Sequence, residues 1–148
     1  MTFSHMLVAI DGSELSGQAV VRALDLARTL GARITFFHAD PGLPGVLAGF
    51  GEQLDPSTVE LLVNASHRQG SKILNEALAK ATAVGVAAAI ETGINPLPHE
   101  AILAAAQRCS ADLIVMASHG RRGLSALLLG SETQKVLTRS PLPVLVVR

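Results

Sequence analysis

Aromatic residues are scarce in this chain, and neither sign of charge predominates. The 148 residues include four Phe but no Trp and no Tyr, and twelve Lys and Arg balance twelve Asp and Glu. A protein that binds nucleic acid needs a basic footprint and commonly offers aromatic side chains on which bases stack. The composition therefore argues against nucleic acid as a partner.

Cysteine and long hydrophobic runs are also nearly absent. The single cysteine, Cys109, excludes an internal disulfide framework, and its apolar surroundings predict a small buried side chain. The N-terminal residues lack the basic and apolar regions of a signal peptide, and no apolar run approaches the ~20 residues that span a bilayer. We therefore expect a cytoplasmic protein that does not enter a membrane.

Charged residues make up only 16% of the chain, whereas 49% of its residues are apolar. A length of 148 residues fits a single domain, residues 1–148, with a sizeable core. Because so little charge is available to cover the surface, we expect exposed apolar area and an oligomer.

Apolar runs alternate with segments of helical periodicity along the whole chain. Such alternation predicts an α/β fold, a doubly wound parallel sheet of five strands with helices on both faces. Ligands of such sheets bind outside the carboxyl ends of the strands, where the strand order reverses. The predicted strands are residues 6–10, 33–38, 86–91, 113–117 and 143–147, and the predicted helices are 14–30, 56–84, 98–109 and 131–139.

A glycine-containing loop, Ser118–Gly130, joins the fourth strand to the last helix. Gly120, Gly123 and Gly130 allow the backbone to approach an anion closely, and the helix that begins at Ser131 adds backbone amides and a partial positive charge. The pattern is typical of phosphate binding, but it also fits a flexible connection before a capped helix. A second polar segment, Asp11–Ser13, follows the first strand, where Asp11 either binds a ribose or a phosphate-bound metal, or simply forms a turn.

Together these segments resemble the universal stress protein family, in its nucleotide-binding branch. The resemblance spans Val8–Ser13, the alternating strands, the glycine loop and the closing Ser140–Arg148. The branch carries a motif of Gly, two residues, Gly, nine residues, Gly, and Ser or Thr. Gly120, Gly130 and Ser131 match it, whereas Ala117 stands at the first glycine. If that position required a positive φ, the alanine would cost about 1 kcal/mol.

The resemblance implies a dimer that binds ATP, or AMP or ADP, with Mg²⁺ as a companion of the phosphates. It also implies strand order 3-2-1-4-5 and pairing of two copies along Val144–Val147. The edge position of this apolar strand favours the same dimer. The residues that the resemblance places around the nucleotide are Ala9, Ile10, Asp11, Ala39, Met116, Ala117, His119, Gly120, Arg121, Gly123, Gly130, Ser131, Glu132 and Thr133.

Several residues of the loop have more than one interpretation. Arg121 and Arg122 either neutralise a triphosphate or are solvated, and His119 is either an acid–base group or a locally hydrogen-bonded side chain. No metal-ligand spacing, Walker A lysine or adenylating serine-glycine-glycine loop occurs. We therefore expect a regulatory, stress-response nucleotide-binding module with slow or no hydrolysis. The alternatives are a dimeric interaction module that does not bind nucleotide and a weak metal-dependent ATPase.

Overall fold

The computed structural model describes residues 2–43, 53–120 and 128–148. Five parallel strands form one sheet, as the sequence pattern predicts, and their order, β3-β2-β1-β4-β5, is the one that the family resemblance implies. The strands are β1 (His5–Ala9), β2 (Arg33–Asp40), β3 (Ala88–Ile94), β4 (Leu113–Ala117) and β5 (Val144–Val147). The order reverses between β1 and β4, which is the point where such a sheet binds its ligands.

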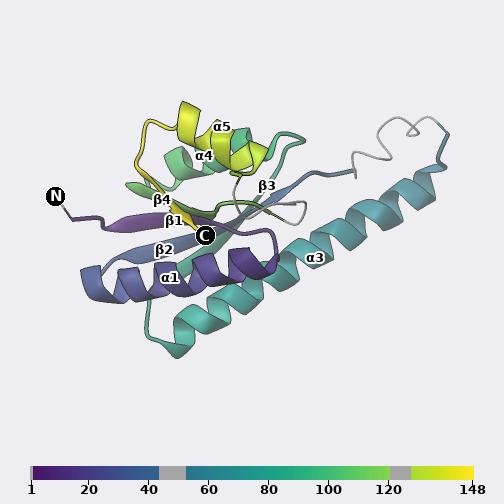
Figure 1. The fold of residues 1–148 in the computed structure, drawn as a ribbon. Helices are drawn as coiled ribbons and strands as arrows, with labels where there is room; N and C mark the ends of the chain where they lie inside the picture. The colour runs from purple at the N-terminus through teal and green to yellow at the C-terminus, as the bar shows by residue number, and fades with distance from the viewer. Residues whose placement is uncertain (1, 44–52, 121–127) are drawn as a thin grey trace.

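The helices cover the two faces of the sheet in pairs (Figure 1). α1 (Glu14–Leu30) and α3 (Pro56–Ala83) lie on one face, and α4 (Pro98–Arg108) and α5 (Ser131–Arg139) lie on the other. Each pair closes its own apolar core, one around Phe36 and the other around Phe37, both fully buried. Burial of a side chain of this size stabilises the fold by roughly 1.5–3 kcal/mol.

Local signals set most of the element boundaries. The Ser13 side chain caps α1 by accepting a hydrogen bond from the Ser16 amide, and Gly31 ends the helix in the left-handed conformation, with φ of 66°. Cys109 is the C-terminal cap of α4 and is half-buried, whereas the sequence predicts that it lies inside the helix and is buried. The predicted bounds of two strands are wrong as well. β2 continues to Asp40, and β3 begins at Ala88 and extends to Ile94.

The pairing of β2 with β3 explains both differences. Asp40 pairs with Ile94, so the two strands run on together beyond the predicted ends. Asp40 is 2% exposed, although the sequence places it in a loop. Its carboxylate accepts hydrogen bonds from the Gly42 amide at 2.8 Å and from the Ser66 hydroxyl at 2.9 Å. Residues 44–52, which belong to the long connection between the predicted second strand and the second helix, lie outside the described residues.

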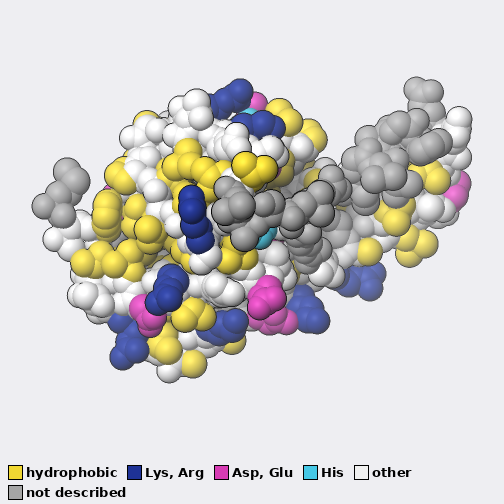
Figure 2. Space-filling view, in the orientation of Figure 1, with side chains coloured by type: hydrophobic (Ala, Val, Ile, Leu, Met, Phe, Trp, Pro, Cys, Tyr) yellow, Lys and Arg dark blue, Asp and Glu magenta, His cyan; other side chains and the backbone are white. Residues whose placement is uncertain are grey.

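The surface carries both signs of charge. On the face that Figure 2 shows, Lys and Arg side chains are interspersed with Asp and Glu side chains over α1 and α3. The N-terminal part of α3 projects beyond the sheet (Figures 1 and 2). None of the helices among the described residues is long and apolar enough to cross a membrane.

Candidate functional site

The carboxyl ends of β1 and β4 bring the two polar segments of the sequence together. Gly120 lies directly against Asp11, and a Cβ atom added at Gly120 would overlap Oδ2 of that aspartate. The two residues are more than a hundred positions apart in the chain, and the parallel pairing of β1 with β4 accounts for their contact. The structure thus joins Asp11 to the start of the glycine loop at the point where the strand order reverses.

Asp11 is half-buried and is held in a local turn. Its Oδ1 accepts a hydrogen bond from the Ser13 amide at 2.9 Å, and its own amide donates to the Ser16 hydroxyl at 3.1 Å. The turn that the sequence offers as one interpretation is therefore present. The other carboxylate oxygen, Oδ2, is the one that lies against Gly120.

The end of the glycine loop is equally close-packed. The Gly130 amide donates to the Ser118 carbonyl oxygen at 2.7 Å. A Cβ atom at Gly130 would stand 3.1 Å from the Cα of His119 and 3.3 Å from that oxygen, which is tighter than ordinary contact. Gly130 has an ordinary φ of −60°, so the close approach of the backbone, and not a left-handed conformation, requires the glycine.

Gly130 is also the N-cap residue of α5, and no side chain among the described residues caps this helix. The first amides of any helix have no acceptor within the helix, and they carry partial positive charge. Ser131 is the first residue of α5, as the sequence predicts. The helix therefore presents its first-turn amides beside His119 and Ser118.

His119 follows the buried Ser118 and is half-buried. Its Nδ1 lies 3.2 Å from the hydroxyl oxygen of Ser118, a local hydrogen bond. The sequence predicts that the partner of His119 is the backbone, whereas the structure shows a bond to the Ser118 side chain. Arg121, Arg122 and Gly123 lie outside the described residues.

Small apolar residues form the strand ends around these groups. Ala9 and Ala39 are half-buried on β1 and β2, and Met116 is 7% exposed on β4. Ala117 is the last residue of β4, 8% exposed, and its φ is not positive. Alanine at the first glycine of the motif therefore causes no backbone strain.

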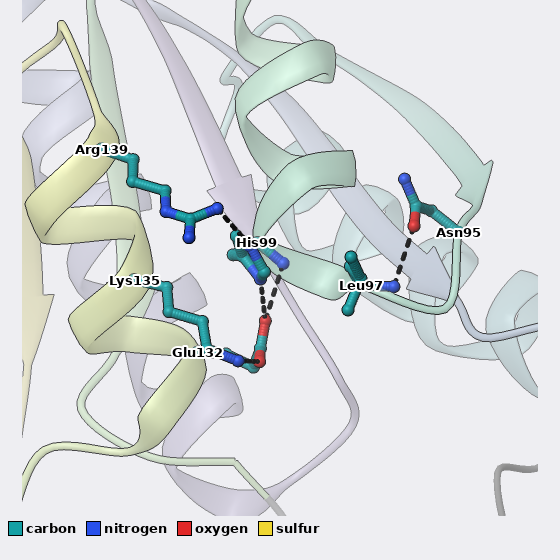
Figure 3. Close-up of polar contacts among 6 residues, drawn as sticks. All are labelled: Asn95, Leu97, His99, Glu132, Lys135 and Arg139. Atoms are coloured by element: carbon teal, nitrogen blue, oxygen red, sulfur yellow. Dashed lines mark hydrogen bonds and ion pairs between the residues drawn. The ribbon is translucent and has the colours of Figure 1, made fainter.

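The first turn of α5 contains the last two predicted site residues. The Thr133 hydroxyl donates to the Ala117 carbonyl oxygen at 3.0 Å and is buried. The Glu132 carboxylate lies toward α4, where it accepts hydrogen bonds from His99 and Lys135 (Figure 3). Burial alone would raise the pKa of Glu132, but the hydrogen bonds from Lys135 and His99 outweigh it and lower that pKa. Both side chains thus serve the packing of the loop and helix.

A separate hollow of about 320 Å³ lies between α1 and α3. Among the described residues, Ile10 is the one predicted site residue that lines this hollow. Its α3 side, which the sequence did not point to, includes Gln69, Lys72, Glu76 and Lys80. His99 was missed as well, because nothing in the local sequence links it to Glu132, 33 positions away. In the described part of the chain, no three His, Cys, Asp or Glu side chains gather closely enough to hold a metal ion.

Comparison with known proteins gives one consistent result. The sequence model of the universal stress protein family matches residues 2–148. The chain is 36% identical over 146 residues to a universal stress protein of Thermus aquaticus, and 34% identical over 153 residues to universal stress protein YxiE of Bacillus subtilis. Each match covers 99% of both proteins.

Solved structures share the fold, and some of them contain adenine nucleotides. The Methanocaldococcus jannaschii protein MJ0577 has a TM-score of 0.84 at 24% identity, covering 99% of this chain and 96% of its own. A universal stress protein in complex with cAMP is 26% identical, with a TM-score of 0.65 over 100% of this chain and 98% of that one. More distant structures from Archaeoglobus fulgidus, with dAMP, and Arabidopsis thaliana, with AMP, have TM-scores of 0.70 and 0.69 at 18% and 17% identity. They cover 100% and 97% of this chain, and 100% and 90% of their own.

Proposed function

The chain belongs to the universal stress protein family, and from this premise we propose that it is an adenine-nucleotide-binding regulatory module. The observation that carries the proposal is the convergence of Asp11, Gly120 and the start of α5, which no described side chain caps, at the switch point of the sheet. A carboxylate that accepts from ribose hydroxyls thereby lies beside backbone amides that suit phosphate.

The residues present fit such a ligand. Neither Gly120 nor Gly130 has room for a side chain: an added Cβ would meet the Asp11 carboxylate at Gly120, and the backbone of His119 and Ser118 at Gly130. Asp11 would hold the ribose, and the amides of Ser131 and the rest of the first turn of α5 would hold the phosphates. The Gly130 amide, which the sequence assigns to the phosphates as well, is instead bonded to the Ser118 carbonyl oxygen. Ala9, Ile10, Ala39, Met116 and Ala117 would form aliphatic walls for adenine. Of the similar structures, the 26%-identical complex with cAMP lends the most support to this ligand class.

We propose ATP as the ligand, with AMP and ADP as the alternatives and Mg²⁺ held mainly by the phosphates. Arg121 and Gly123 complete the proposed site. His119, the candidate acid–base group of the loop, is hydrogen-bonded to the Ser118 hydroxyl. We propose that the output is a change of state on binding, with slow or no hydrolysis, and that the protein acts in the cytoplasm.

The absorbance spectrum of the protein offers a direct first test. Without Trp or Tyr, the protein absorbs weakly in the near ultraviolet, so a nucleotide that copurifies with it will dominate the spectrum. The protein is then stripped of nucleotide and titrated with ATP in a calorimeter. We expect saturable binding of one nucleotide per chain. A stripped, folded protein that shows no binding heat at any temperature tested overturns the proposal and favours an interaction module without nucleotide.

We also propose that two copies pair along β5. This strand is an edge of the sheet, it is entirely apolar in sequence, and its Leu145 side chain is 39% exposed. An uncovered apolar edge strand favours pairing with a second chain. Val146→Asp should yield monomers in sedimentation velocity, whereas Ile90→Asp on the opposite edge strand, β3, should leave the dimer intact. A Val146→Asp variant that remains dimeric contradicts this interface.

A further inference from the structure

His99 joins the start of α4 to both ends of α5. It is the second residue of α4, and its side chain is 3% exposed. Its ring contacts Glu132 in the first turn of α5 and Arg139 at the last residue of that helix (Figure 3). Glu132 and Arg139 are two helical turns apart and therefore share one face of α5. One buried ring thus contacts both the first and the last turn of α5 on the same face.

The chemistry of the partners fixes the protonation of the ring. An Arg guanidinium can only donate hydrogen bonds, so Nε2 of His99 accepts from Nη1 of Arg139, at 3.1 Å. Nδ1 then carries the proton and donates it to Oε2 of Glu132, at 2.8 Å. The contact is specific for a neutral imidazole in this tautomer, since protonation of Nε2 would remove the acceptor for Arg139.

The same glutamate caps α4 from outside. The N-cap residue of α4 is Leu97, which has no side-chain acceptor, and the His99 amide instead donates to Oε2 of Glu132, at 2.8 Å. Lys135 binds the other carboxylate oxygen at 2.9 Å. The negative charge of Glu132 is therefore directed toward the start of α4 and compensated there (Figure 3). This orientation directs the Glu132 carboxylate away from the helix start at which we place the anionic ligand.

We propose that His99 is a positioning residue for the phosphate end of the nucleotide site, acting through Glu132 and Arg139 to fix the first turn of α5. This inference rests on the proposed function, because the amides of Ser131 and the rest of that turn are the groups assigned to the phosphates. His99 itself does not contact the ligand. Loss of the ring should therefore weaken the binding of the phosphate and leave the binding of the nucleoside nearly unchanged.

The experiment compares AMP with adenosine on three full-length variants. His99→Ala removes both ring contacts, and His99→Asn retains a donor near the position of Nδ1. His5→Ala is the matched control, because His5 is 7% exposed and bonded to Thr35 at 2.8 Å, at the opposite end of β1. We expect His99→Ala to lower AMP affinity about tenfold, and adenosine affinity by less than about twofold. His99→Asn should recover most of the loss, and His5→Ala should preserve the ratio of the two affinities.

Hydrogen exchange separates the failure of this inference from the failure of the proposed function. The Gln134 amide donates to the Gly130 carbonyl oxygen and reports the first turn of α5 without any ligand. In His99→Ala this amide should exchange faster than in His5→Ala when both are compared at equal global stability. If the wild type binds neither ligand, the proposed function fails, and this exchange rate still decides the role of His99.

Two results would overturn the inference. One is an unchanged ratio of AMP to adenosine affinity in His99→Ala, and the other is an equal exchange rate in the two alanine variants. Should His99→Ala fail to fold, Arg139→Met takes its place, because Arg139 is exposed and its loss removes only one of the two ring contacts. We expect the same selective loss of AMP affinity there, smaller in size, and an unchanged ratio contradicts the inference equally.

Discussion

Two of the helices that follow the carboxyl ends of strands, α1 and α5, differ in their first turns. The N-terminus of α1 is capped by neighbouring residues of the chain. The Ser13 hydroxyl oxygen accepts a hydrogen bond from the Ser16 amide at 3.2 Å, and Asp11 accepts one from the Ser13 amide. α5 begins at Gly130, which has no side chain to offer. A helix start that satisfies its own amides is a structural element, whereas one without a side-chain cap suits an external acceptor. The contrast supports the assignment of the anion site to α5.

The largest expected effect comes from obstructing the start of α5. Gly130→Val places atoms against the Cα of His119 and the carbonyl oxygen of Ser118, so the loop must shift. We expect ATP affinity, measured by calorimetry, to fall at least tenfold, about 1.4 kcal/mol. Gly17→Ala in α1 is the control, since its added Cβ meets nothing within 4 Å. Unchanged affinity in Gly130→Val would show that the loop is wrongly assigned.

A smaller effect is expected from breaking the cap of α1. Ser13→Ala removes the acceptor for the Ser16 amide and should lower the free energy of unfolding by about 1 kcal/mol. Urea unfolding followed by circular dichroism measures it, because the chain has no Trp or Tyr to report by fluorescence. ATP affinity should change less than about twofold. A large loss of ATP affinity would instead place the ligand at α1.

The smallest expected effect concerns acid stability. Hydrogen bonds hold the pKa of Glu132 below its usual value of 4.5, so the native state favours the ionised carboxylate. Its contribution to stability is fully present above that usual value and is lost as pH falls through the lowered pKa. Because the side chain is one-third exposed, we expect only about 0.5 kcal/mol.

Unfolding of Glu132→Gln as a function of pH measures this contribution. The variant should be less stable than the wild type at neutral pH, and the difference should vanish in acid. Glu100→Gln, an exposed position in the first turn of α4, is the control. A pH profile of Glu132→Gln that runs parallel to the wild type contradicts the role of this carboxylate.

Local signals explain what could be predicted from the sequence. Ser13 and Gly31 fix both ends of α1, and the apolar run of β4 has the predicted bounds, because these features depend on neighbouring residues alone. The contact of Asp11 with Gly120 follows from the parallel order of strands that end in polar segments. The convergence of the two segments is therefore readable from the pattern, whereas the strand order was implied by the family resemblance.

Long-range pairing explains what could not be predicted. The shift of β3 depends on its register with β2, and the Thr92-Gly93 segment reads as a turn unless Asp40 and Ile94 are known to pair. The His99–Glu132 contact depends on how α4 and α5 pack, which no spacing in the sequence encodes. The one local sign of it was an apolar residue, Leu97, at the start of a helix, where a capping side chain is usual.

Amide chemical shifts during a titration with AMP test the central claim most directly. The site at the switch point predicts that the largest changes fall on Gly120, Gly130 and the first turn of α5, with small changes at the first turn of α1. The hollow between α1 and α3 provides the contrasting outcome, because Ser13 and Gly17 line it opposite Lys72. Changes that concentrate on those residues, with α5 unaffected, would contradict the account.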